Sequence, residues 1–230
     1  ARDEIQVKKQ HDLGIWVTGA RSHRDRLLSR PAGSLSVGGG RVLHHPELVL
    51  RPTDRVALAG PNGAGKSTLL RALLADGLHV TEEHLVYVPQ EVDMERSRHL
   101  LTAARVLPGD RLGQLMTVVS CLNSRPGRLL QSDLPSPGEA RKLLIAEGIV
   151  RQPHLIVMDE PTNHMDLPSI ECLETALQSC PCGLLLVSHD ERFLQGLVTT
   201  RWELSWVGAP GGDARLQVCR LPRALELLVE

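Results

Sequence analysis

The stretch from Gly60 to Thr68 constrains this chain more than any other part of its sequence. It reads Gly-Pro-Asn-Gly-Ala-Gly-Lys-Ser-Thr and fits the pattern G-x-x-x-x-G-K-[ST] of a phosphate-binding loop. An apolar run over residues 55–59 precedes the loop, and a helix-like run over residues 68–74 follows it. This strand–loop–helix context is the one that the motif requires. The sequence therefore predicts a nucleoside triphosphate site at this loop.

The residue types in the loop suit a polyphosphate. Glycines let backbone N–H groups converge on phosphate oxygens, and the start of the following helix adds the positive end of its dipole. We expect Lys66 to reach the β- and γ-phosphates and the Ser67 hydroxyl to bind Mg²⁺. The nucleotide-contacting residues predicted from this motif are Gly60, Pro61, Asn62, Gly63, Ala64, Gly65, Lys66, Ser67 and Thr68.

Bulk properties exclude several other classes of protein. The chain has 230 residues, enough for one large domain or a core with a small subdomain. A net charge of -1 gives no overall attraction to nucleic acid or membrane, and 2% aromatic residues disfavour a base-stacking surface. No apolar run approaches the roughly 18 residues of a membrane span, and no signal peptide is evident. The first residue, Ala1, indicates a processed chain or a fragment.

The cysteines do not form a pattern typical of a disulfide framework. They are odd in number and scattered, at Cys121, Cys172, Cys180, Cys182 and Cys219. A metal clip of the Cys180–Cys182 pair with His189 is disfavoured because the chain has no C-x-x-C motif. We therefore expect reduced thiols and a cytoplasmic protein.

The order of apolar segments predicts an α/β fold. Strands are expected at residues 55–59, 85–88, 155–158 and 183–187, and their non-alternating apolar pattern is typical of a parallel sheet covered on both faces. Helices are expected near 97–107, 111–122, 138–151 and 168–179. Short apolar pieces within residues 13–50 predict edge strands of a β subdomain. Residues 1–12 are charged and indicate the end of a helix or linker, and the arginines from Arg21 to Arg30 indicate a solvated loop rather than an RNA contact.

Three polar groups follow predicted strands, where parallel strands present their ligands. Asp159 and Glu160 end the run at 155–158, so Asp159 is placed to hold Mg²⁺ and Glu160 to act as general base towards water. His189 follows the strand at 183–187 and can contact the γ-phosphate or orient that water. Gln90 follows the strand at 85–88, and its amide oxygen can reach Mg²⁺ or the water.

The segment Ser136–Glu139 has the S-x-x-E pattern of a helix capping box, with Pro137 at the first helical position. Such a capped helix start can also bind an anion. We expect Ser136, Gly138 and Glu139 to clamp a phosphate, and the phosphate can belong to a nucleotide on a different loop.

Taken together and in this order, these residues resemble the nucleotide-binding domain of ATP-binding cassette (ABC) proteins. Gly60–Ser67 looks like its Walker A motif, Gln90 like its Q-loop, and Ser136–Glu139 like its signature. Leu155–Glu160 resembles Walker B with the catalytic glutamate. Asn163–Asp166, with Asp166 at the nucleotide interface, resembles the D-loop, and His189 the H-loop. The resemblance implies a P-loop core with a mixed or parallel sheet flanked by helices, an N-terminal antiparallel β subdomain and a helical insertion at about 91–150, all in one domain over residues 13–230.

The amino-acid sequences of residues 159–167 and 188–194 resemble those of the ABC-F subfamily, whose members carry two cassettes in one soluble chain and act on the ribosome. This chain resembles the C-terminal cassette, with residues 1–12 as the end of an interdomain linker. The resemblance implies Mg-dependent ATP hydrolysis, a second cassette as partner, and action on the ribosome and its rRNA in translation or antibiotic resistance. The alternative is the motor subunit of an ABC membrane transporter, and a nucleotide-sensing module without hydrolysis is disfavoured by the intact Lys66 and Glu160.

The sequence departs from the family pattern at a few positions. Pro135 and Pro137 replace the usual Leu and Gly of the signature, and Met165 replaces a Leu. Between residues 20 and 50 there is no Tyr or Phe to stack on adenine, so apolar contact from Val42 or Leu43 is the expected substitute.

Overall fold

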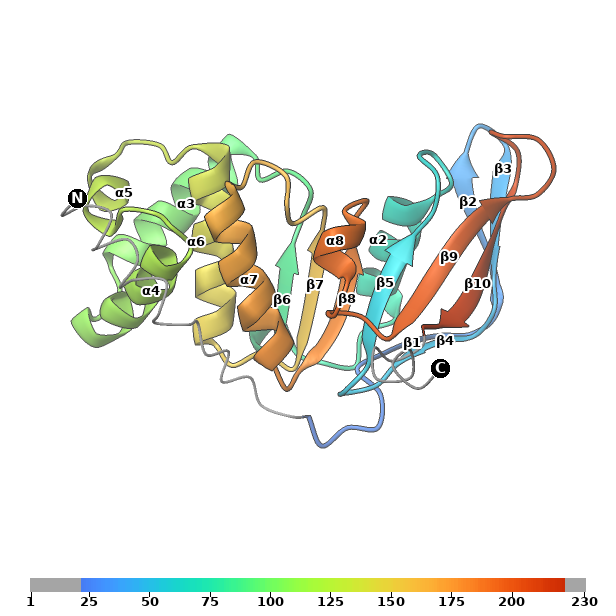
Figure 1. Cartoon of the computed structure of the whole chain (residues 1–230), viewed down its shortest axis with the longest axis horizontal. Coiled ribbons are helices and arrows are strands. Elements are labelled where there is room, and N and C mark those ends of the chain that lie inside the picture. Colours follow the sequence, from blue (N-terminus) through green and yellow to red (C-terminus); the bar gives the residue numbers. More distant parts are fainter. Residues whose placement is uncertain (1–21, 222–230) are drawn as a thin grey trace, which may run out of the picture.

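The computed structural model describes residues 22–221 (Figure 1). The predicted linker end at residues 1–12 and the apolar piece at residues 15–17 lie outside the described residues. The strands are β1 (Leu28–Arg30), β2 (Gly33–Gly38), β3 (Arg41–His45), β4 (Leu48–Leu50), β5 (Arg55–Ala59), β6 (Leu85–Val88), β7 (Leu155–Asp159), β8 (Gly183–Val187), β9 (Thr200–Trp206) and β10 (Ala214–Arg220). The helices are α2 (Lys66–Asp76), the 3₁₀ turn η1 (Glu82–His84), α3 (Met94–Arg105), α4 (Gly109–Cys121), α5 (Pro126–Gln131), α6 (Pro137–Val150), α7 (Leu167–Ser179) and α8 (Glu191–Leu194).

One mixed sheet organises these elements. Within the described residues its eight strands run in the order β2-β3-β10-β9-β5-β8-β7-β6, and β1 pairs with β4 in a separate antiparallel ribbon. The strands β9, β5, β8, β7 and β6 are parallel to one another. β10 is antiparallel to β9, and the β2–β3 hairpin continues the sheet beyond it. The parallel half therefore carries the strand ends on which a ligand site is built.

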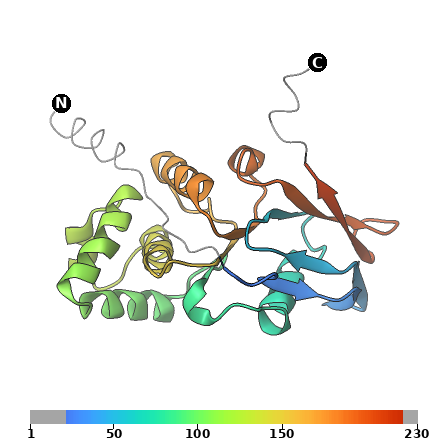
Figure 2. The ribbon, with the colours of Figure 1, turned by 90° about the horizontal axis from the view of Figure 1, so that it is seen from below.

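Helices cover both faces of the parallel strands, as Figure 2 shows. Alternate residues of β7 divide between two cores because successive side chains point to opposite faces. Ile156 and Met158 pack with helices α6, α7 and α8, whereas Leu155 and Val157 pack with α2 on the other face. Both faces are buried, which explains the uninterrupted apolar sequence of this strand.

Helices α3, α4, α5 and α6 gather at one end of the molecule, to the left in Figure 1. They share a third core, which includes Leu101, Leu115, Leu129 and Leu143. Helix α6 also packs against the sheet, through Leu144, Ile145 and Ile149. Helix α6 therefore joins the helical part to the sheet.

The predicted fold class is confirmed, including the mixed sheet, the antiparallel strands near the N-terminus and the inserted helices. No helix was expected at α5, which begins at a Pro-Gly pair, and Pro126 stands in the first turn of this helix. The sequence pattern also missed the strands β9 and β10. Among the described residues, no helix combines the length and the apolar character that crossing a bilayer requires.

The expectation of reduced thiols is wrong for one pair. Cys180 and Cys182 form a disulfide between α7 and β8. Pro181 separates them, and their Cα atoms lie 5.5 Å apart, within the range that a disulfide spans. Both cysteines are almost completely buried.

Candidate nucleotide site

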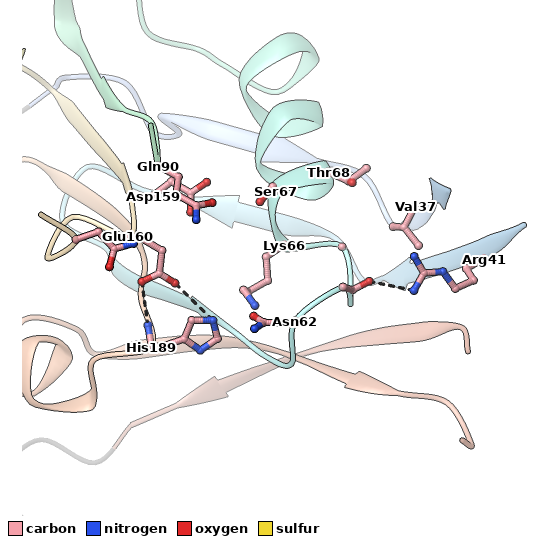
Figure 3. Close-up of a pocket in the computed structure, with 13 residues that line it drawn as sticks. Val37, Arg41, Asn62, Lys66, Ser67, Thr68, Gln90, Asp159, Glu160 and His189 are labelled. Atoms are coloured by element: carbon pink, nitrogen blue, oxygen red, sulfur yellow. Dashed lines mark hydrogen bonds and ion pairs between the residues drawn. The ribbon is translucent and has the colours of Figure 1, made fainter. Parts of the chain in front are cut away.

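A cavity of about 460 Å³ lies at the carboxyl ends of the parallel strands (Figure 3). Residues from the β2–β3 hairpin, the phosphate-binding loop and the ends of β6, β7 and β8 line it. The lining residues are Val37, Arg41, Asn62, Gly63, Gly65, Lys66, Ser67, Thr68, Gln90, Asp159, Glu160, Asn163 and His189. Segments far apart in sequence thus meet at one edge of the sheet.

The phosphate-binding loop requires glycine at Gly65. This residue has a φ of 102°, and a Cβ placed on it would lie 2.6 Å from Cγ1 of Val37. A side chain here would suffer both backbone strain and a clash with the hairpin. The loop therefore packs closely under β2, and α2 begins directly after it at Lys66.

Lys66 is placed to exchange loop contacts for a phosphate. Its Nζ donates hydrogen bonds to the carbonyl oxygens of Gly60 at 2.8 Å and Pro61 at 3.3 Å. Burial lowers the pKa of Lys66, and the nearby Glu160 and Asp159 carboxylates oppose that shift. Gly60, Pro61 and the fully buried Ala64 shape the loop from behind rather than line the cavity. The ammonium group faces the cavity in Figure 3.

Asp159 and Glu160 stand at the end of β7 with different environments. Burial, and next the charge of Glu160, raise the pKa of Asp159, while Lys66 and Arg141 lower it. Glu160 has a left-handed backbone with φ of 49°, and its N–H donates to the Val187 carbonyl at 2.7 Å. The Glu160 side chain is only 12% exposed. An acidic pair held this closely favours a cation between it and a polyanion.

His189 contacts Glu160 from the end of the neighbouring strand. Its Nε2 lies 3.5 Å from Oε1 of Glu160, and its backbone N–H donates to Oε2 at 3.4 Å. The His189 side chain is about half exposed, so it can meet a ligand in the cavity. Figure 3 shows both contacts as dashed lines.

Oxygen groups suited to Mg²⁺ meet on one side of the cavity. Ser67, Gln90 and Asp159 line it from α2, the end of β6 and β7, and Figure 3 shows them near one another. Hydroxyl, amide and carboxylate oxygens are ligands that Mg²⁺ accepts, with water and phosphate completing its shell. Within residues 22–221, no group of three His, Cys, Asp or Glu side chains could hold a metal by itself.

Two residues of the β2–β3 hairpin line the cavity but were not predicted as site residues from the sequence. Arg41 donates to the carbonyls of Gly38 at 3.2 Å and Gly63 at 3.3 Å, and Val37 packs over the loop. The glycines at 38–40, which form the hairpin turn, were the available signal. Of the expected adenine contacts, Leu43 is buried in the core and neither it nor Val42 lines the cavity, whereas Val37 does.

The predicted phosphate clamp lies in a separate hollow of about 550 Å³. The predicted capping box is confirmed, since Ser136 Oγ accepts from the Glu139 N–H and the Glu139 carboxylate accepts from the Ser136 N–H. Burial alone would raise the pKa of Glu139, but its hydrogen bonds from Ser136 lower it. The hollow is lined by Asn123, Ser124, Arg125, Arg128, Ser136, Gly138, Glu139, Lys142 and His164.

Asp166 lies in a third place, at the start of α7. Lys142 Nζ donates to its Oδ1 at 2.8 Å, and Ser169 and Asn123 donate short hydrogen bonds to the same carboxylate. Burial opposes them, but these hydrogen bonds lower the pKa of Asp166 to about 2. The structure thus brings Lys66, Ser67, Gln90, Asp159, Glu160 and His189 together and keeps Ser136, Gly138, Glu139 and Asp166 apart from them.

The fold and this cavity define a P-loop nucleotide-binding protein. A family model described as "ABC transporter" matches residues 43–163. The zinc import ATP-binding protein ZnuC of Yersinia enterocolitica is 33% identical over 172 residues, covering 68% of this chain and 68% of that protein. The chain belongs to the ABC transporter family and is an ATPase domain of that family. ATPases of this family generally bind ATP and Mg²⁺.

Solved structures support the fold. The complex of archaeal ribosomal stalk protein aP1 and archaeal ribosome recycling factor aABCE1 matches with a TM-score of 0.60 at 19% identity, over 86% of this chain and 41% of that one. A dimeric post-hydrolysis state of an ATP-binding cassette bound to ADP and Pi matches with a TM-score of 0.60 at 15% identity, over 85% and 98%. The chain therefore spans about two fifths of the recycling factor and nearly all of the single cassette.

Proposed function

We propose that the cavity binds Mg-ATP and hydrolyses it. The observation that carries this proposal is the convergence of Lys66, Asp159, Glu160 and His189 in one cavity around the phosphate-binding loop. On binding, the Lys66 ammonium exchanges the Gly60 and Pro61 carbonyls for phosphate oxygens. This exchange conserves hydrogen bonds while it pairs a partly desolvated cation with an anion.

The bound Mg²⁺ supplies charge neutralisation on the phosphates, and the oxygens of Ser67, Gln90 and Asp159 suit it. The raised pKa of Asp159 fits this role, because a cation compensates the desolvated carboxylate.

Hydrolysis requires an activated water opposite the leaving group. In the proposed step the oxygen of that water bonds to the γ-phosphorus, the bond to the bridging oxygen of ADP breaks, and Glu160 takes a proton from the water. His189, at 3.5 Å from the Glu160 carboxylate, orients that carboxylate and faces the γ-phosphate. Two contacts from His189 leave Glu160 few orientations, which favours this geometry.

We propose further that the site is completed by a second cassette. The clamp residues Ser136, Gly138 and Glu139 line their own hollow and do not reach the cavity of the same chain. Their capped helix start suits a phosphate presented by another chain or domain. The cassette bound to ADP and Pi with which this chain shares its fold is a dimer, which supports a second cassette as partner.

For the output of the ATPase cycle, we propose a motor role in an ABC membrane transporter. The support is the similarity to zinc import ATP-binding proteins over two thirds of both chains. A second candidate function is action on the ribosome. It is supported by the ABC-F-like sequences of residues 159–167 and 188–194 and by the fold shared with a ribosome recycling factor.

Hydrolysis is tested with Lys66→Ala and Glu160→Gln in parallel. We expect Lys66→Ala to lose Mg-ATP binding, and Glu160→Gln to bind Mg-ATP while turnover falls by about 10²–10⁴-fold. Wild-type turnover should rise more than linearly with protein concentration if a second cassette is needed. Unchanged turnover in Glu160→Gln would refute the catalytic assignment.

The output is tested by trapping Glu160→Gln protein with ATP in a lysate of its source cells and separating membranes from ribosomes on a sucrose gradient. ATP-dependent association with membranes supports the transporter motor. ATP-dependent sedimentation with ribosomes overturns that proposal in favour of the ribosomal candidate.

A further inference from the structure

Arg141 is a buried cation that does not line the nucleotide cavity. It stands in α6, one turn beyond the clamp residues, and is 1% exposed. Its Nη1 donates to the Glu160 carbonyl at 2.5 Å, and its Nη2 donates to the carbonyls of Gln90 and, at 3.4 Å, Pro89. One guanidinium therefore joins the backbone of the proposed base to that of a proposed Mg²⁺ ligand.

The Glu160 backbone needs such support. Its φ of 49° is a left-handed conformation that strains a residue with a side chain, so neighbouring contacts must hold it. Its N–H donates to the Val187 carbonyl at 2.7 Å, and its carbonyl accepts from Arg141 and, at 3.2 Å, from the Asn163 N–H. Because both polar groups of the residue are fixed, the carboxylate is directed towards the cavity and His189.

The next residue of α6 holds the other end of the same loop. Lys142 pairs with Asp166 at 2.8 Å, so consecutive cations of one helix fix both ends of the segment 160–166. The helix also lies close to the middle of this segment. A Cβ on Gly138 would lie 2.6 Å from the His164 carbonyl oxygen. Movement of α6 must therefore move this segment or break these contacts.

We infer that Arg141 is a positioning residue for ATP hydrolysis, which holds the backbone of Glu160 so that its carboxylate meets the attacking water. Arg141 does not touch the nucleotide, and it ties the helix that begins at the phosphate clamp to the base. The inference rests on the proposed role of Glu160. An arginine suits this place because its planar fork can serve several carbonyls at once, whereas Lys offers a single ammonium.

Arg55 provides a matched control. It is an arginine of intermediate burial that, like Arg141, donates to several backbone carbonyls, those of Leu177 at 2.8 Å, Gln178 at 3.3 Å and Cys180 at 2.6 Å. It begins β5, at the end of the sheet opposite the cavity. Replacing either arginine with Met removes hydrogen bonds to several carbonyls, so both variants should lose stability, but only Arg141→Met should lose turnover.

The experiment measures steady-state ATP hydrolysis and Mg-ATP binding for Arg141→Met and Arg55→Met, at the protein concentration that gives the maximal wild-type rate. We expect Arg141→Met to lower kcat on the order of 10²-fold while Mg-ATP affinity stays at the wild-type value. Arg55→Met should keep the wild-type kcat. Arg141→Lys, which keeps the charge, should recover part of the rate, and it replaces the Met variant if that does not fold. A wild-type kcat in either Arg141 variant would overturn the inference.

A double-mutant cycle separates this role from a general structural one. In a Glu160→Gln background, adding Arg141→Met should leave the residual rate unchanged, because the group that Arg141 positions has lost its basicity. A further fall by the same factor as in the wild type would show that Arg141 acts by another route and would overturn the inference. If Glu160→Gln alone keeps the wild-type rate, the proposed function itself fails, which is a distinguishable result.

Discussion

The pairing between Asp166 and α6 leads to a prediction about stability and pH. The pKa of Asp166 falls from 3.8 to about 2 through hydrogen bonds from Lys142, Ser169 and Asn123. At about 1.36 kcal/mol per unit, this shift is equivalent to about 2.4 kcal/mol. The Asp166 side chain is 43% exposed, so solvent screening reduces the net contribution to about 1 kcal/mol.

Asp166→Asn keeps the shape of the side chain and removes its charge. The folded-state pKa is depressed, so the stabilisation is present above the unfolded pKa near 4 and is lost as the pH falls towards 2. We expect Asp166→Asn to lower the free energy of unfolding by about 1 kcal/mol at pH 7. The difference from wild type should shrink steadily below pH 4.

The assay is urea denaturation between pH 7 and pH 2.5, followed by the fluorescence of tryptophans such as the buried Trp202. Asp133→Asn, at an exposed position just before the phosphate clamp, controls for the loss of one negative charge. A difference between Asp166→Asn and wild type that is equal at pH 7 and pH 2.5 would refute the electrostatic reasoning. So would the absence of any difference at pH 7.

Other substitutions test the loop, the disulfide and the histidine. Gly65→Ala should lower the free energy of unfolding by about 1–3 kcal/mol and abolish Mg-ATP binding. Adding Val37→Ala removes the clash and should recover part of the stability in thermal melts. Full recovery would contradict a role for the positive φ. Cys180→Ser should lower the free energy of unfolding by about 1–2 kcal/mol in urea titrations, because the disulfide closes only a short loop in the unfolded chain. Full reduction of the wild-type bond to Cys182 should have the same effect. A larger loss would contradict this loop-closure argument. His189→Ala should reduce kcat by about 10²-fold with unchanged Mg-ATP affinity in equilibrium binding, whereas a change in affinity alone would contradict its proposed role.

Local patterns made the parallel half of the fold predictable. The strands β5, β7 and β8 are short apolar runs buried on both faces, and each is followed by polar residues that the sheet brings together. The parallel register follows from the alternation of strands and helices, so the meeting of Lys66, Asp159 and His189 could be expected from the sequence.

The antiparallel half was less predictable because its pairing is distant and its pattern is weak. β10 pairs with β3 through Ala214 and Leu43, which are separated by most of the chain. β10 alternates buried Ala214 and Leu216 with exposed Arg215 and Gln217, but its last four residues are all exposed, so the alternating burial is short. The glycines at 38–40 mark the hairpin turn that carries Val37 and Arg41, but its place beside the phosphate-binding loop depends on this distant pairing.

Sequence reasoning also could not find the buried cations of α6. Arg141 and Lys142 are 1% and 6% exposed, and a charged pair in a helix is ordinarily assigned to the solvent face. Their burial depends on acceptors supplied by Gln90, Glu160 and Asp166, which come from other elements. A buried charge is tolerated only where such partners exist, and the partners are a property of the tertiary structure.

The segment between β7 and α7 borders both the nucleotide cavity and the hollow of the phosphate clamp. A few contacts of this segment can therefore link the two sites. Asn163 lines the nucleotide cavity, and His164, the next residue, lines the hollow of the phosphate clamp. A φ of 62° at His164 turns the chain from one to the other. If each hollow holds a phosphate, both phosphates act on adjacent residues of one short segment whose ends are fixed to α6. Rotation of α6 would then displace Glu160 directly, without any longer route through the core.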